Sequence, residues 1–156
     1  SAICREEKIE IYSVATKCLF GNFSKDEIKS AQTTLRNWLA ATNRLGVSTM
    51  RVSIGGEELR DPTHQQIVFK SLTEVINEGE YPSISVGIEN QEPGVVQQIE
   101  DVIEMDQLSV GKLKLILDNG SFFDKSTVYK FIENAMPYAI LIHAKITEFD
   151  DIRSLP

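Results

Sequence analysis

Short apolar runs typical of strands alternate along this chain with longer segments that have helical periodicity. Five runs fit the strand pattern, and they cover residues 9–15, 47–54, 83–89, 113–118 and 139–145. A helix-like segment separates each run from the next, at the spacing of βα units. Strands connected in this way lie parallel in one sheet, and right-handed crossovers place the helices on its faces. The 156-residue chain is therefore predicted to be one α/β domain, residues 1–156.

The segment after Phe23 carries the strongest helix signals. Ser24 and Glu27 have the spacing of a capping box, and Gly46 supplies a stop signal. The residues predicted to face the core recur at helical spacing: Ile28, Ala31, Leu35, Trp38, Leu39, Thr42 and Leu45.

Three further helices are predicted downstream. The first opens at Asp61 and Pro62, and the last is capped by Asp124. The helix between them has Pro93 near its first turn and buries Val95 and Val96, together with apolar residues that follow.

Two architectures share this order of elements, the (β/α)8 barrel and the doubly wound open sheet. A dinucleotide-binding sheet is not favoured, because no G-x-G-x-x-G pattern follows the first predicted strand. In both architectures the binding groups lie at the carboxyl ends of the parallel strands. The residues at these ends therefore distinguish the two.

Glu89, Asp118 and His143 lie at the ends of three consecutive predicted strands. Consecutive strands of a barrel are neighbours about 4.8 Å apart, so these side chains can converge there more naturally than in an open sheet. Two carboxylates and one imidazole suit Mn²⁺, Mg²⁺, Co²⁺ or Zn²⁺. Ordinary roles remain open for each: a solvated loop residue, a turn former and a core histidine.

Net charge and hydropathy narrow the classes of partner. The formal charge of −7 and the pI near 4.9 oppose binding to a phosphate backbone, so no nucleic acid is expected. No apolar run approaches the length of a membrane span, and no membrane partner is expected. Cys4 and Cys18 are interpreted as reduced thiols in a cytoplasmic protein, with a disulfide as the alternative.

Several motifs in the second half of the chain resemble those of a known superfamily. They read LDNGSF at 117–122, MPYA at 136–139 and HAKITEFD at 143–150. In order and spacing they resemble the xylose isomerase-like barrel superfamily of sugar phosphate isomerases and epimerases, which is related to AP endonuclease family 2. The resemblance extends from about Ile9 to Asp151. It implies a parallel (β/α)8 TIM barrel, of which this chain supplies about five strands and four helices.

The resemblance also implies roles for individual residues. Glu89, Asp118 and His143 match metal ligands of the superfamily, and Glu89 also matches a carboxylate that moves a proton beside the substrate carbonyl. Lys145 matches a lysine that contacts a substrate oxygen. Asn90 and Ser121 are predicted to contact substrate.

Arg51 lies within a predicted strand and has two predicted roles. It either contacts an anionic substrate or pairs with Glu10. The sequence leaves these two roles open.

The superfamily site is completed by a glutamate on the eighth strand, beyond what this chain matches. A whole barrel needs about 250 residues. We therefore expect the chain to be part of a longer polypeptide, or to be closed by another chain, as in a homo-oligomer. The predicted function is a divalent-metal-dependent sugar or sugar phosphate isomerase or epimerase. An endonuclease IV-like phosphodiesterase and a non-catalytic barrel-derived binding module are the alternatives.

Overall fold

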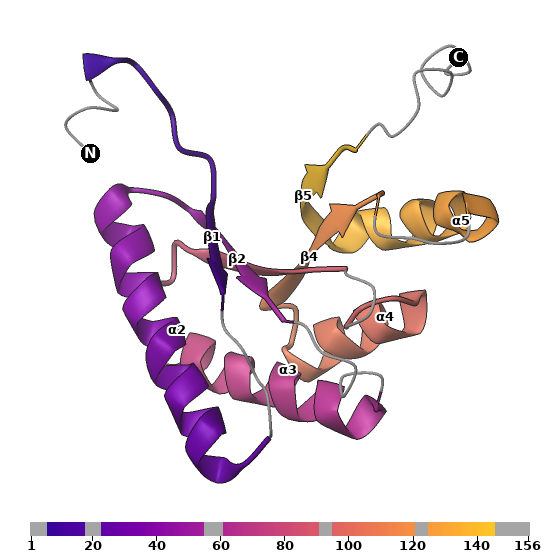
Figure 1. The fold of residues 1–156 in the computed structure, drawn as a ribbon, viewed down its shortest axis with the longest axis horizontal. Coiled ribbons are helices and arrows are strands. Elements are labelled where there is room, and N and C mark those ends of the chain that lie inside the picture. Colours follow the sequence, from indigo (N-terminus) through magenta and orange to yellow (C-terminus); the bar gives the residue numbers. More distant parts are fainter. Residues whose placement is uncertain (1–5, 18–22, 55–60, 91–94, 121–124, 146–156) are drawn as a thin grey trace.

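Five parallel strands form one sheet, in the order in which they occur along the chain (Figure 1). The computed structural model describes residues 6–17, 23–54, 61–90, 95–120 and 125–145. The strands are β1 (Val14–Lys17), β2 (Thr49–Ser53), β3 (Ser85–Glu89), β4 (Leu113–Asp118) and β5 (Ala139–His143). This parallel sheet of alternating α and β elements confirms the predicted fold class.

Helices connect the strands and cover one side of the curved sheet (Figure 1). They are α2 (Lys25–Leu45), α3 (Pro62–Asn77), α4 (Ile99–Leu108) and α5 (Lys125–Ala135), and the 3-10 helix η2 (Met136–Tyr138) leads into β5. The predicted limits of α2 are confirmed. The Ser24 hydroxyl accepts a hydrogen bond from the amide of Glu27, and Gly46 ends the helix at a φ of 73°. None of the helices in the described part of the chain has both the length and the apolar composition of a membrane span.

The hydrophobic core lies between the sheet and its helices. Every second residue of the central strands belongs to it: Met50 and Val52 of β2, Val86 and Ile88 of β3, and Leu113, Leu115 and Leu117 of β4. Successive side chains of a strand point to opposite faces, so the residues between these point away from the helices. The opposite face of the sheet is therefore where polar strand residues can lie.

The parallel pairing of β4 with β5 contains one register shift. Leu115 pairs with Ala139 and Ile116 with Leu141, which leaves Ile140 as an extra residue in β5. Ile140 and Ile116 both approach Gly87 of β3, on the face opposite the helices. Beyond the shift, Asp118 is the direct partner of His143.

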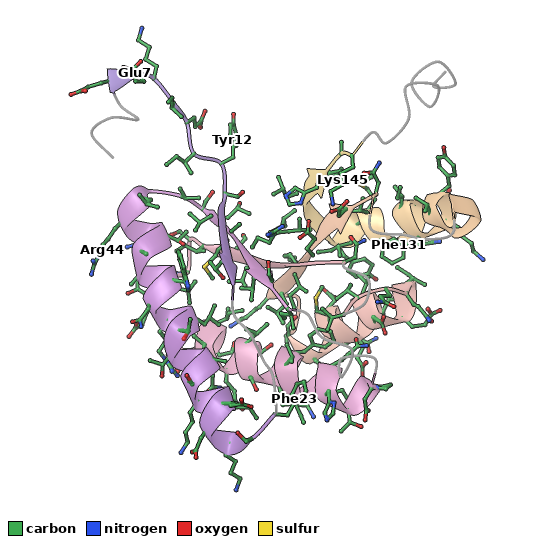
Figure 2. All side chains as sticks on the ribbon, in the orientation of Figure 1. Glu7, Tyr12, Phe23, Arg44, Phe131 and Lys145 are labelled. Atoms are coloured by element: carbon green, nitrogen blue, oxygen red, sulfur yellow. The ribbon has the colours of Figure 1, made fainter. Side chains whose placement is uncertain are left out.

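The first strand begins later than the sequence predicted. Residues 9–13 lie outside β1, which starts at Val14, where pairing with Met50 of β2 begins. Tyr12, just before it, is 74% exposed and extends away from the sheet (Figure 2). Of the predicted run 9–15 only Val14 and Ala15 lie in β1, and the strand continues to Lys17, beyond the predicted end, because pairing with β2 covers Val14 to Lys17.

The prediction for α4 was also wrong at its start. The helix begins at Ile99 and does not include Val95 or Val96, although both are fully buried. Val96 has a φ of 61°, a left-handed conformation that a helix cannot contain and that β-branched residues rarely adopt. Asp101 then caps the helix by accepting from the amides of Gln97 and Gln98.

Two further predictions concern the core-facing residues of α2 and the cap of the last helix. Trp38 and Leu45 were expected in the core but are 37% and 43% exposed, because the buried face of α2 passes through Ala31, Leu35, Leu39 and Thr42. The predicted cap at Asp124 lies outside the described residues.

Candidate metal centre

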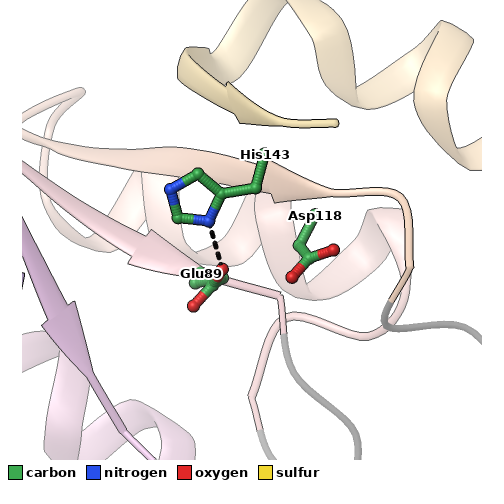
Figure 3. A group of neighbouring side chains, drawn as sticks. All are labelled: Glu89, Asp118 and His143. Atoms are coloured by element: carbon green, nitrogen blue, oxygen red, sulfur yellow. Dashed lines mark hydrogen bonds and ion pairs between the residues drawn. The ribbon is translucent and has the colours of Figure 1, made fainter. Parts of the chain in front are cut away.

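The three predicted metal ligands meet at the carboxyl end of the sheet (Figure 3). Glu89, Asp118 and His143 are the last residues of β3, β4 and β5. One potential ligand atom of each lies within 4.8 Å of those of the other two. Parallel pairing of adjacent strands produces this convergence, because their carboxyl ends share one edge of the sheet.

Glu89 lies between two groups that hydrogen-bond its carboxylate. Its Oε2 accepts from Nη1 of Arg51 at 2.5 Å, and its Oε1 lies 2.5 Å from Nδ1 of His143 (Figure 3). The Glu89 side chain is only 10% exposed, so the guanidinium supplies charge that solvent does not. A ring nitrogen of His143 can bind a metal ion only when it carries no proton, so the neutral imidazole is the form that can act as a ligand.

Asp118 is the most buried of the three ligands, with 2% of its side chain exposed. Its Oδ2 accepts from the ammonium of Lys145, and its Oδ1 accepts from the amide of Gly120 at 2.9 Å. A buried carboxylate requires such partners, because its desolvation is otherwise costly. The structure therefore brings Lys145 into the same cluster as the three predicted ligands.

Two asparagines extend the pairing of the strands beyond their ends. The amide of Asn90 donates to the carbonyl of Asp118 at 2.8 Å and accepts from its N–H at 2.7 Å. Asn119 does the same to Lys145, at 3.1 Å and 2.7 Å. Each side chain replaces the backbone of one further strand residue, and so fixes the main chain at Asp118 and at Lys145.

The environments of the other predicted site residues vary. Asn90 is buried and its amide is bonded to the backbone, so the structure gives it a positioning role, and its substrate contact stays a prediction. Arg51 pairs with Glu89 and not with Glu10, which corrects one of the two roles expected for it. Its Nε is buried without a hydrogen-bond partner among the described residues. Ser121 lies outside the described residues.

Asn119 and Gly120 are site residues that the sequence reasoning missed as contributors. The available signal was the repetition of a ligand followed by asparagine, in Glu89-Asn90 and Asp118-Asn119. That repetition has meaning only once the register of β3, β4 and β5 is known. It then marks two equivalent turns at the same edge of the sheet.

The donor set fits a small divalent ion. Metal–oxygen and metal–nitrogen bonds of about 2.1 Å place adjacent ligand atoms of one ion roughly 3.0–3.4 Å apart. The ligand atoms here lie within 4.8 Å of one another, so the three side chains would draw closer together around an ion. Two carboxylates and an imidazole are also the ligand types that Mn²⁺, Mg²⁺, Co²⁺ and Zn²⁺ accept.

No protein-family model and no curated protein matches this chain. Solved structures match its fold. A probable 3-DHS dehydratase from Bacillus anthracis matches with a TM-score of 0.73 and 12% identity, over 99% of this chain and 58% of the other. A xylose isomerase domain protein from Planctomyces limnophilus matches with a TM-score of 0.67 and 12% identity, over 91% and 56%. A sugar phosphate isomerase/epimerase from Parabacteroides distasonis matches with 0.58 and 15%, over 97% and 60%.

These similarities concern the fold. At identities of 12 to 15% they do not identify a reaction, and this chain spans less than two thirds of the length of each of the three proteins. The shared order of parallel strands and covering helices is what aligns. The strands and helices described here therefore have the fold of part of a TIM barrel, as in these solved structures.

Proposed function

We propose that this chain carries the metal-binding part of a divalent-metal-dependent sugar or sugar phosphate isomerase or epimerase. The observation that supports this most directly is the cluster of Glu89, Asp118 and His143 at the carboxyl end of three adjacent strands. Binding groups of TIM barrels lie at that end, whichever reaction they catalyse. The fold alone would not identify the chemistry, because TIM barrels host many activities.

The similar structures support the class of reaction. They include a D-tagatose 3-epimerase-like protein and a sugar phosphate isomerase/epimerase, beside the probable dehydratase. Isomerisation and epimerisation of a sugar can begin with removal of a proton from the carbon beside a carbonyl group. A carboxylate base is suited to this step, and the substrate class proposed here is a small sugar or its phosphate.

Glu89 is the group that we assign to proton transfer. Arg51 and His143 hold its carboxylate from two sides, so its orientation is fixed before a substrate arrives. The ammonium of Lys145 is near enough to the cluster to donate a hydrogen bond to a substrate oxygen. A divalent ion held by Glu89, Asp118 and His143 would polarise the carbonyl and stabilise the negative charge that develops on its oxygen.

Metal binding by the purified 156-residue chain tests the proposal. Titration calorimetry with Mn²⁺ should give one site per chain. Asp118→Asn should weaken binding by about 100-fold, because a charged ligand is lost, and His143→Ala should weaken it similarly. The matched control is Asp106→Asn, which changes a carboxylate on α4 that pairs at 3.8 Å with Lys114, outside the cluster. That variant should bind like the wild type.

The outcomes separate the enzyme from its main alternative. Both carboxylates of the cluster already have protein cations as partners, which is the observation that favours a non-catalytic binding module. The absence of Mn²⁺ binding at any concentration would support that module. We propose that the reaction needs a second proton-transferring carboxylate besides Glu89, so we expect little or no turnover by this chain alone. Rapid isomerase turnover would contradict the need for that second carboxylate.

A further inference from the structure

The candidate metal centre contains two carboxylates and two protein cations. Arg51 pairs with Glu89, and Lys145 pairs with Asp118. The four charges of these two ion pairs cancel. A divalent ion that enters the cluster adds two positive charges, so its electrostatic attraction to the cluster is weakest while both cations stay in place.

We propose that Lys145 is an internal counter-ion, which occupies Asp118 in the metal-free chain and is displaced by the divalent ion. The proposal rests on the metal dependence of the proposed function. Beyond that function, it states that the Lys145 ammonium and the metal ion compete for one carboxylate oxygen. The contested atom is Oδ2 of Asp118, which the Lys145 ammonium now holds.

Burial indicates which of the two cations moves. The side chain of Lys145 is 55% exposed, whereas that of Arg51 is 26% exposed. An ammonium that turns from Asp118 into water regains its hydration, so displacement costs little. Arg51 is in the middle of β2, and its guanidinium is confined against Glu89. Lys145 lies beyond the last residue of β5, where Asn119 fixes its main chain.

Gly120 makes the ion pair possible. A Cβ atom at this position would lie 2.6 Å from Cδ and 2.9 Å from Cβ of Lys145. These distances are shorter than a non-bonded contact allows, and the Cβ of Lys145 is not the free end of the side chain. The stem of Lys145 therefore crosses directly over Gly120 to reach Asp118. Gly120 is a positioning residue, since its effect on Asp118 passes through Lys145.

Displacement would couple metal loading to substrate contact. In the structure the ammonium donates to Asp118. Once the metal ion holds that carboxylate, the same ammonium is released beside the site. It is then able to donate to an oxygen of the sugar, so Lys145 is available to the substrate only when the metal is bound.

Mn²⁺ affinities of single variants test the competition. Lys145→Met removes the competing cation, and we expect it to bind Mn²⁺ roughly three- to tenfold more tightly than the wild type. Gly120→Ala keeps the charge but moves the lysine off Asp118, and it should also tighten binding. Lys114→Met is the matched control. Lys114 lies on β4, the strand that carries Asp118, but it pairs with Asp106 of α4, and its loss should leave the affinity within about twofold.

Thermal unfolding gives a second readout. Without metal, Lys145→Met should melt at a lower temperature than the wild type, because buried Asp118 loses its ammonium partner. With saturating Mn²⁺ the difference should shrink or reverse, because bound metal stabilises the folded state. A lysine with only a structural role would leave the same difference in both conditions.

The results distinguish this inference from the proposed function. If the wild type binds Mn²⁺ and Lys145→Met binds it equally or more weakly, the competition is disproved while metal dependence stands. If neither protein binds Mn²⁺, both proposals fail. If only Lys145→Met binds, the lysine competes for the site but the metal ion does not displace it, and the displacement is disproved.

Discussion

The two faces of the sheet differ in chemistry although they alternate residue by residue along the same strands. On the face toward the helices, the central strands present only apolar, fully buried side chains, such as Ile88 and Leu115. On the other face the same strands present Arg51 and Glu89, together with Gly87 and Ile116. A register shift of one residue in any of these strands would exchange its helix-facing side chains with those on the other face.

Within each central strand, the residues that stabilise the fold and the residues that carry charged groups therefore lie on opposite faces. Burial of a leucine or isoleucine side chain contributes roughly 1.5–3 kcal/mol, and the helix-facing residues supply that contribution. The opposite face can then hold charged groups that are costly to bury, because their ion pairs are adjacent in the sheet. Substitutions on the two faces should therefore have distinguishable effects.

The largest effect on stability is expected on the face toward the helices. Leu115→Ala removes a fully buried side chain from the core and should lower the free energy of unfolding by about 2–5 kcal/mol. Urea denaturation followed by circular dichroism measures the change. Ile142→Ala, on the half-exposed part of β5, is the control and should cost about 1 kcal/mol or less. Equal losses in the two variants would mean that the core is not concentrated on this face.

A smaller loss is expected from added volume on the opposite face. A Cβ at Gly87 would lie 2.6 Å from Cγ1 and 2.8 Å from Cδ1 of Ile116, so Gly87→Ala should cost about 1–3 kcal/mol. This exceeds the entropic gain that alanine usually brings over glycine. The same urea experiment checks it. A Gly87→Ala variant as stable as the wild type would show that Ile116 and Ile140 have room to move.

The smallest effect is expected outside the sheet, at the exposed ion pair between Arg36 and Glu78. The hydrogen bond from Arg36 lowers the pKa of Glu78 below its ordinary value of 4.5. A lowered folded-state pKa stabilises the fold above the unfolded value, and this contribution is lost as the pH falls through the folded value. Glu78→Gln should therefore be slightly less stable than the wild type at pH 7.

Unfolding curves from pH 7 to pH 2.5 check this prediction. The difference between Glu78→Gln and the wild type should decline below pH 4.5 and disappear at the acid end. A difference that stayed constant with pH would assign the effect to packing of the side chain.

The sequence predicted which three residues would cluster, but not the partners of their carboxylates. Glu89 and Asp118 follow apolar strand residues directly, so their place at the carboxyl end of a sheet is readable from local order. The partnership of Arg51 with Glu89 depends instead on the register of β2 against β3, where Arg51 pairs with Gly87. Register is a property of two segments and is not contained in either one alone.

Local conformation limited the prediction in a second way. The apolar residues around Val95 have the composition of a helix face, and both Val95 and Val96 do reach the core. Val96 has a left-handed φ, which β-branched residues rarely adopt, and it is fully buried. The start of α4 could therefore not be located from residue preferences.

The contacts of Asn119 also bear on the chemical lifetime of the chain. An asparagine followed by glycine is prone to deamidation, in which the next backbone nitrogen attacks the side-chain carbonyl carbon. Here the amide of Gly120 donates to Asp118, and the Asn119 side chain is held by the main chain of Lys145. The folded site thus opposes the attack. Conversion of Asn119 to aspartate would replace the donor that faces the Lys145 carbonyl with an acceptor. Deamidation would therefore remove a hydrogen bond that fixes the main chain of Lys145.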